Sequence, residues 1–193
     1  MTRPKDDERT ALEARAGELE QEIMSRRAEL AELQRRLATE PIEDLTFRDA
    51  DGEVRLSDLF GDRDDLLLVH NMGRRCPWCT LWGDGFNGAL GAITSRASFV
   101  VSSPDEPEVQ GAFHAERGWQ FRMVSAPDAV IERFGFKSGD QLMPGVSALR
   151  RETDGSIRRV GRAWFGPRDD FCAVWHLFDL LAGGPGDWRP AFQ

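Results

Sequence analysis

Two cysteines separated by two residues, Cys76 and Cys79, have the spacing in this chain that best suits a chemical reaction. An apolar run at 66–69 precedes them and predicts a buried strand, and the residues after them can form a helix. A thiol at a helix N-terminus faces free N–H groups and the positive end of the helix dipole, and both favour the thiolate. Arg74 and Arg75 add positive charge beside it. The pattern therefore predicts a reactive thiolate at Cys76.

The cysteine pair has three interpretations. A C-x-x-C sequence beside a strand and a helix is typical of a thiol–disulfide redox site. Half of a four-ligand zinc site is the second, and it would draw its other ligands from Cys172, His70, His114 and His176. No second pair among these has metal-ligand spacing, so we expect neither a metal nor another cofactor. A reduced, idle pair is the third.

The composition of the chain limits the classes of partner that it can bind. The chain has 193 residues and a net charge of −8, which argues against nucleic-acid binding through bulk electrostatics. No apolar run approaches the length of a membrane span, and the N-terminus lacks the pattern of a signal peptide. Three cysteines do not suggest a secreted disulfide framework. We therefore expect a cytoplasmic protein whose partner is a protein or small molecule carrying a disulfide, with neither nucleic acid nor membrane involved.

The N-terminal segment, residues 1–40, predicts one long helix over 6–38. Its apolar residues follow steps of four and three, with Arg26 as the one charged defect, at Leu12, Ala16, Leu19, Ile23, Leu30, Leu33 and Leu37. This heptad pattern favours a short coiled coil that dimerises the protein through residues 6–38. An amphipathic helix lying against its own domain is the alternative, and Gly17 and Arg26 weaken the coiled coil.

Residues 41–193 predict a globular α/β domain, because strand-like and helix-like patterns alternate along them. Strands are expected at 45–48, 54–56, 66–71, 98–102, 119–124, 146–150 and 157–165. Helical segments are expected at 57–60, after Cys76, and at 104–117, 128–134 and 167–181. The glycine-rich run at 83–88 predicts that the helix after the cysteines bends or breaks, or that another backbone approaches it closely.

The order of these elements resembles the thioredoxin-like fold in its peroxiredoxin-type form, a mixed central sheet flanked by helices. Within that superfamily, the cysteine motif with the run at 82–88 is similar to the bacterial domain of unknown function 899 family. The segment at 100–121, with its Gly-Trp-Gln-Phe at 118–121, resembles the same family. The likeness covers roughly 41–182.

The resemblance implies roles for single residues. Cys76 matches the attacking cysteine of thioredoxin-like oxidoreductases and Cys79 matches the resolving one. Pro144 matches the fold's cis-proline, which faces the cysteines. His70 stands where thioredoxins carry an acid that moves a proton from the resolving thiol; the alternative is a strand-end histidine bonded to backbone.

Around the motif, Arg75, Pro77, Trp78 and Trp82 are expected to form a rim that docks a substrate, or a lid. Neither cysteine is preceded by the Pro-x-x-x-Thr-x-x-Cys pattern with which peroxiredoxins bind peroxide, so a fast peroxidase is not expected. Two functions follow. One is a thiol–disulfide oxidoreductase using Cys76 and Cys79, and the other is a non-catalytic interaction module dimerised through its N-terminal helix.

Overall fold

A computed structural model describes residues 6–37 and 40–192 in two units, which are a single helix and a domain beginning at Glu40. The helix α1 (Asp6–Leu37) is continuous, as its composition predicts. Ion pairs three or four residues apart, such as Arg9–Glu13 and Arg26–Glu29, line its surface. Taken by itself α1 buries none of its residues, so its heptad seam is solvent-exposed. Residue 38, the predicted end of this helix, lies outside the described residues.

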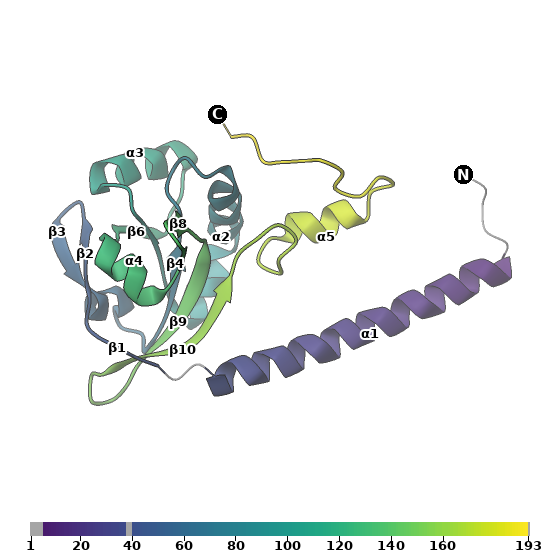
Figure 1. The fold of residues 1–193 in the computed structure, drawn as a ribbon, viewed down its shortest axis with the longest axis horizontal. Coiled ribbons are helices and arrows are strands. Elements are labelled where there is room, and N and C mark those ends of the chain that lie inside the picture. Colours follow the sequence, from purple (N-terminus) through teal and green to yellow (C-terminus); the bar gives the residue numbers. More distant parts are fainter. Residues whose placement is uncertain (1–5, 38–39, 193) are drawn as a thin grey trace. The chain divides into compact units, whose positions relative to one another are not determined.

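The domain is built on one mixed sheet with the strand order β1-β10-β9-β4-β5-β6-β2-β3 (Figure 1). Its strands are Glu40–Ile42 (β1), Thr46–Asp49 (β2), Gly52–Arg55 (β3), Asp65–His70 (β4), Ser98–Ser103 (β5), Arg122–Ser125 (β6), Gly145–Arg151 (β9) and Ile157–Trp164 (β10). The central strands β4, β5 and β6 are parallel, and every other pairing is antiparallel. A separate small hairpin joins Lys137–Ser138 (β7) to Gln141–Leu142 (β8).

The helices of the domain are Pro77–Arg96 (α2), Pro107–Arg117 (α3), Asp128–Phe134 (α4) and Ala173–Asp179 (α5), and Leu56–Phe60 (η1) forms a 3-10 turn. Both α3 and α4 end at a glycine in the left-handed conformation, Gly118 and Gly135, as their sequences indicate. No helix within the described part of the chain combines the length and apolar character needed to cross a membrane.

The sheet carries a hydrophobic core on each face, because successive residues of a strand point to opposite sides. Leu66 and Leu68 of β4 belong to one core, which includes α4 and η1. Val69 belongs to the other, which includes the cysteine end of α2 and Trp175 of α5. Figure 1 shows α4 and α2 on opposite sides of the sheet. This alternation decides which β4 residues can reach the cysteines.

Several predicted helix and strand boundaries were wrong. The last helix spans Ala173–Asp179 rather than 167–181, because 166–172 form a turn in which Asp169 accepts N–H bonds from Gly166 and Phe171. The helix α3 begins at Pro107 rather than at residue 104. The third strand is Arg122–Ser125 rather than 119–124. The short strands β1, β7 and β8 were not predicted.

The expected bend or break at 83–88 is absent, and α2 is continuous through its glycines. The other alternative, a close approach, is what occurs, although a ring makes it rather than backbone. A Cβ on Gly83 would lie 2.6 Å from Cζ2 of Trp119. Asp84 accepts a 2.8 Å hydrogen bond from Trp119 Nε1, and Asn87 accepts one of 2.8 Å from the backbone N–H of Gln120. The glycine-rich run of α2 is therefore the docking surface for the segment at 118–121.

We expect Gly83→Ala to destabilise the domain by about 1–3 kcal/mol, because Trp119 is buried and held by Asp84 and must shift to admit the methyl group. Gly91→Ala, two turns along the same helix, meets nothing within 4 Å and should stabilise it by up to about 1 kcal/mol. Urea unfolding midpoints measure both. Equal effects from the two substitutions would contradict the close approach.

Candidate functional site

The loop before Cys76 is fixed by two hydrogen bonds to side chains. Asn71 Oδ1 accepts the N–H of Gly73 at 2.7 Å, and Gly73 adopts a φ of 100°, a conformation that favours glycine. Asp105 then accepts the backbone N–H of Arg74 at 2.7 Å. These contacts turn the chain sharply after β4 and deliver Cys76 to the N-terminus of α2.

Cys76 is the N-cap residue of α2, and its sulfur accepts the backbone N–H of Cys79 at 3.1 Å. Hydrogen bonding from the Cys79 thiol is the main reason that the pKa of Cys76 falls to about 7. The backbone N–H groups of Cys79 and Trp78 lower the pKa further, while burial opposes them. The predicted thiolate at Cys76 thus has a geometric basis, which the neighbouring arginines do not supply.

The surroundings of Cys79 shift its pKa in the opposite direction, upward. It lies deeper than Cys76, and its sulfur accepts the Met72 N–H at 3.4 Å. The hydrogen bond to Cys76 and then burial raise its pKa well above the ordinary value for a thiol. Both cysteines are free thiols in this structure. The pair therefore consists of an acidic outer thiol and a protonated inner one.

Alkylation of Cys76 by iodoacetamide should rise with pH and reach half its maximum rate near pH 7, because only the thiolate reacts. The sign follows from the lowered pKa, since thiolate accumulates as pH increases through that value. Stopped-flow alkylation of a Cys172→Ser variant between pH 5 and 10 measures it. A midpoint near pH 9, the ordinary range of a thiol, would contradict the hydrogen-bonding scheme.

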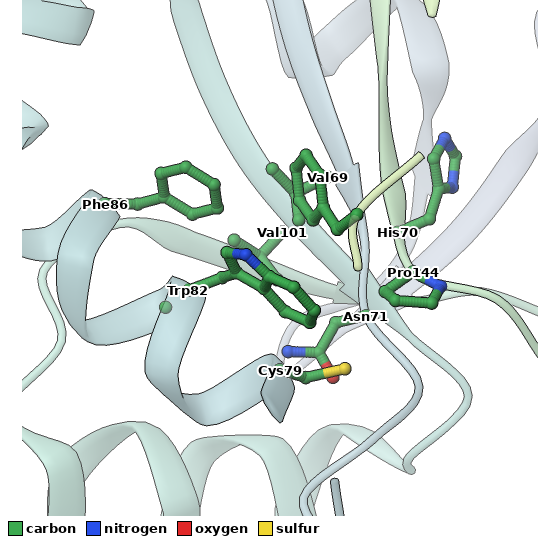
Figure 2. Close-up of a pocket in the computed structure, with 10 residues that line it drawn as sticks. Val69, His70, Asn71, Cys79, Trp82, Phe86, Val101 and Pro144 are labelled. Carbon is green, nitrogen blue, oxygen red and sulfur yellow. The ribbon is translucent and has the colours of Figure 1, made fainter. Parts of the chain in front are cut away.

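Behind Cys79 lies a small cavity of about 10 Å³, the space of about one water molecule (Figure 2). The side chains of Asn71 and Pro144 lie beside the Cys79 sulfur, and Trp82 closes the opposite wall. The indole of Trp82 is buried, and its hydrogen bonding to the Asp169 carboxyl lowers the pKa of that group against the larger effect of burial. Cys79 itself is only 3% exposed.

His70 is not placed to take a proton from Cys79. It follows Leu66 and Leu68 in the alternation of β4, so its imidazole lies on the face opposite α2, stacked on Phe136 with ring centroids 4.2 Å apart. Figure 2 shows the ring pointing away from Cys79. Burial and then the charge of Arg159 lower the pKa of His70 to about 3, and its Nε2 lies 2.9 Å from Ser147 Oγ. The expected backbone partner is thus a side-chain hydroxyl.

Pro144 lies next to the cysteines, as the resemblance implies, but the expected cis bond was wrong. No peptide bond in the described residues is cis, so the bond before Pro144 is trans. Flanking hydrogen bonds hold this trans chain path. Met143 donates to Phe136 O at 3.0 Å, and the Pro144 carbonyl accepts the Phe165 N–H at 2.9 Å.

The four rim residues separate into two groups. Arg75, Pro77 and Trp78 lie at the surface around Cys76. Trp82 does not, because it is only 3% exposed and packs on Phe165 with ring centroids 5.4 Å apart. Trp82 is therefore a wall behind Cys79 rather than part of the rim.

The residues considered as zinc ligands are dispersed. His114 Nε2 lies 2.9 Å from the carbonyl of Phe121, His70 contacts Ser147, and Cys172 caps α5. Within residues 6–37 and 40–192, no group of three or more His, Cys, Asp or Glu side chains is arranged to hold a metal ion.

The sequence profile of a bacterial protein family of unknown function, DUF899, matches residues 1–189. The chain belongs to this family. No curated protein matched the chain in a sequence search.

Solved structures place this DUF899 chain among thioredoxin-like proteins of the peroxiredoxin type. A peroxidoxin, BcpB, from Mycobacterium tuberculosis is 26% identical with a TM-score of 0.53, and the match covers 66% of this chain and 84% of that one. A peroxiredoxin Q mutant from Xylella fastidiosa is 17% identical with a TM-score of 0.55, and the match covers 66% of this chain and 84% of that one. A Xanthomonas campestris peroxiredoxin Q mutant is 21% identical with a TM-score of 0.52, and the match covers 63% of this chain and 80% of that one. The fold is thus the thioredoxin-like one that the sequence indicated.

Sequence reasoning missed the C-terminal aromatic segment, residues 172–192, which packs against the cysteine motif. Trp78, between the two cysteines, contacts Trp175 and Trp188 with ring centroids 5.5 and 6.4 Å apart. Phe178 meets Trp188 edge-on at 4.9 Å. Cys76 belongs to the same hydrophobic core as Trp175 and is only 9% exposed. The tryptophans of this segment were a signal, but nothing in their spacing indicated where they would pack.

Proposed function

We propose that this DUF899 protein is a thiol–disulfide oxidoreductase whose attacking residue is Cys76. The observation that carries the proposal is the asymmetry of the two thiols. Cys76 accepts the N–H of Cys79 at 3.1 Å at the start of α2, and Cys79 lies behind it as a protonated reserve thiol. This is the arrangement that a two-step exchange requires.

In the first step the Cys76 thiolate attacks one sulfur of a substrate disulfide. The substrate S–S bond breaks, a mixed disulfide forms, and one substrate thiolate leaves. In the second step Cys79 loses its proton and attacks the Cys76 sulfur, which releases the second substrate thiolate. The substrate gains two electrons. One of its two thiols takes the proton that Cys79 loses, and the other takes a proton from solvent. The Met72 N–H, which already bonds to the Cys79 sulfur, supports the developing thiolate there.

Similarity to solved structures supports redox chemistry in general terms. Those proteins are a peroxidoxin and peroxiredoxins, and the M. tuberculosis protein shares 26% identity with this chain. The missing Pro-x-x-x-Thr-x-x-Cys pattern and the presence of a close cysteine pair favour disulfide exchange over peroxide reduction here. Three cysteines do not suggest a secreted disulfide framework, so a cytoplasmic location is part of the proposal.

The deciding experiment is the redox potential of the Cys76–Cys79 pair, measured by thiol trapping across glutathione and dithiothreitol series. A two-electron transition between about −300 and −120 mV would support the proposal and show in which direction the enzyme runs. A pair that never forms a disulfide would exclude it. The Cys172→Ser variant serves as the background for trapping, because its remaining thiols are the pair itself.

One observation favours the second candidate, a non-catalytic interaction module. The C-terminal aromatic segment holds Trp78, and Cys76 is only 9% exposed, which would suit a surface used only for binding. Such a module would fold normally and bind a partner, yet show no turnover with any disulfide. The same trapping experiment separates the two functions.

We also propose that the protein dimerises through α1, because that helix exposes an apolar heptad seam of the kind that pairs in coiled coils. Native mass spectrometry should give a dimer for the full chain and a monomer for a chain beginning at Glu40. Replacing Leu19 and Leu30 with glutamate is a matched control that keeps the length, and it too should give a monomer. An unchanged mass per particle after truncation would contradict the coiled coil.

A further inference from the structure

A groove of about 450 Å³ lies beside the cysteine motif and has the size of a small-molecule site. Arg75 and Pro77, the residues on either side of Cys76, both line it. Its opposite side comes from α3, including Phe113, and its edge from the C-terminal tail at 190–192. A molecule in this groove would therefore contact the two residues that flank Cys76, although Cys76 itself is not part of the lining.

The groove carries two arginines that serve no partner in the protein. The side chains of Arg74 and Arg75 make no hydrogen bond or ion pair with any described residue, whereas most arginines of the domain are bound to carboxylates or carbonyls. They also do not account for the lowered pKa of Cys76, whose causes are Cys79 and two backbone N–H groups. Two free cations beside the nucleophile, in a chain of net charge −8, remain to be explained.

The other charges of the groove do not cancel these cations. Arg117 also lines it but is committed to Asp84, and its guanidinium lies 4.9 Å above the ring of Phe192. Glu116 is the one carboxylate in the lining, and it is exposed on α3. Asp105 is nearby but already accepts the backbone N–H of Arg74. The net charge at the mouth of the groove is therefore positive.

The C-terminal aromatic segment limits what can enter. Cys76 is 9% exposed, and Trp78 is packed against Trp175 and Trp188. A disulfide on the surface of a folded protein would need this segment to move away. The groove is open while the segment stays in place, so a small disulfide can bind there beside the residues that flank Cys76.

We propose that this groove is the substrate site, and that it takes a low-molecular-weight disulfide bearing carboxylates, held by Arg74 and Arg75. This rests on the proposed function and names its substrate class. The carboxylates bind the guanidinium groups, and the disulfide lies toward Cys76. The Cys76 thiolate breaks the S–S bond and forms a mixed disulfide, and Cys79 displaces the second thiol, so that the pair is oxidised and the substrate reduced.

The test measures oxidation of the fully reduced Cys172→Ser protein by three probes in single turnovers. Oxidised glutathione carries carboxylates, hydroxyethyl disulfide is small and neutral, and insulin carries its disulfides on a protein. Arg74→Gln combined with Arg75→Gln should slow the reaction with oxidised glutathione by about tenfold or more, while hydroxyethyl disulfide changes less than about twofold. Added salt should slow the reaction of oxidised glutathione with the protein that keeps Arg74 and Arg75. It should slow neither the reaction of hydroxyethyl disulfide nor the reaction of oxidised glutathione with the doubly substituted variant.

Arg162→Gln is the matched control, because Arg162 is exposed on β10 and lies outside the groove lining. It should change no rate. Insulin should react at least about tenfold more slowly than oxidised glutathione. An equal loss with the charged and neutral probes, no loss with either, or insulin reacting as fast as oxidised glutathione would overturn the substrate assignment. No reaction with any of the three would instead overturn the proposed function itself.

Discussion

A Cys79→Ser variant will accumulate a stable mixed disulfide between Cys76 and its substrate, whereas a Cys76→Ser variant will form none. The inner thiol is the group that releases the second half of the substrate, so its loss stops the reaction after the first step. Loss of Cys76 leaves Cys79 and Cys172, and burial raises the pKa of both thiols. The exchange rate should fall by about fiftyfold or more, since Cys76 with a pKa of about 7 is about half thiolate at pH 7, whereas a pKa of about 9 leaves about 1% thiolate.

Mass spectrometry after mixing with oxidised glutathione identifies the adduct and the cysteine that carries it. Cys172→Ser is the control, because that thiol is buried and its pKa is raised by burial. It should react as the unsubstituted protein does. An adduct on Cys79 in the Cys76→Ser variant, at an undiminished rate, would reverse the roles assigned to the two thiols.

A Gly145→Ala substitution should cost about 3 kcal/mol or more, the largest stability effect expected of so small a change in this domain. A Cβ at this position would lie 2.1 Å from Cε1 of Phe136 and 2.4 Å from the backbone oxygen of Ala163. Phe136 is buried under His70, and the Ala163 oxygen belongs to the neighbouring strand, so neither can move away freely. In a domain of this size the midpoint of thermal unfolding should fall by about 6–12 °C.

Gly161→Ala on the adjacent strand β10 is the matched control. Its Cβ would lie 3.5 Å from the Ala148 methyl carbon, which is an ordinary contact. The substitution should change the free energy of unfolding by less than about 1 kcal/mol. Scanning calorimetry on both variants gives the comparison. A Gly145→Ala protein as stable as the control would mean that the strand approach at Pro144 is looser than the structure shows.

The elements that could be predicted are those whose signal is local. Apolar runs located β4 and β5, and the turn residues at 49–52 located the hairpin of β2 and β3. The glycines of α2 were ambiguous because their explanation lies elsewhere, at Trp119, with which Gly83 makes its close contact. The predicted length of α5 was wrong for a similar reason, because hydrogen bonds accepted by the Asp169 side chain hold 166–172 as a turn instead of a helix.

At the site, the motif alone was enough to identify the attacking thiol but not its surroundings. Strand β4 is apolar on both faces, so its sequence could not indicate that Val69 faces the cysteines while His70 faces away. The cis bond at Pro144 was inferred from resemblance, and the hydrogen bonds that hold the trans path involve Phe136 and Phe165, distant in sequence. The aromatic cover over Trp78 depends on contacts about a hundred residues away along the chain.

The sheet also has a consequence for the order in which the protein can be completed on the ribosome. Strand β1 pairs with β10, and the carboxylate of Glu40 binds the buried Arg159, 119 residues later. At about 5–20 residues per second, synthesis separates these two groups by about 6–24 seconds. Throughout that time the strand that begins the domain lacks the neighbour with which it pairs, and both cysteines are made after about the first third of it. The nascent chain therefore carries its reactive thiols before the last hairpin and the aromatic segment can enclose them, and this is the interval in which it is most open to unwanted disulfides.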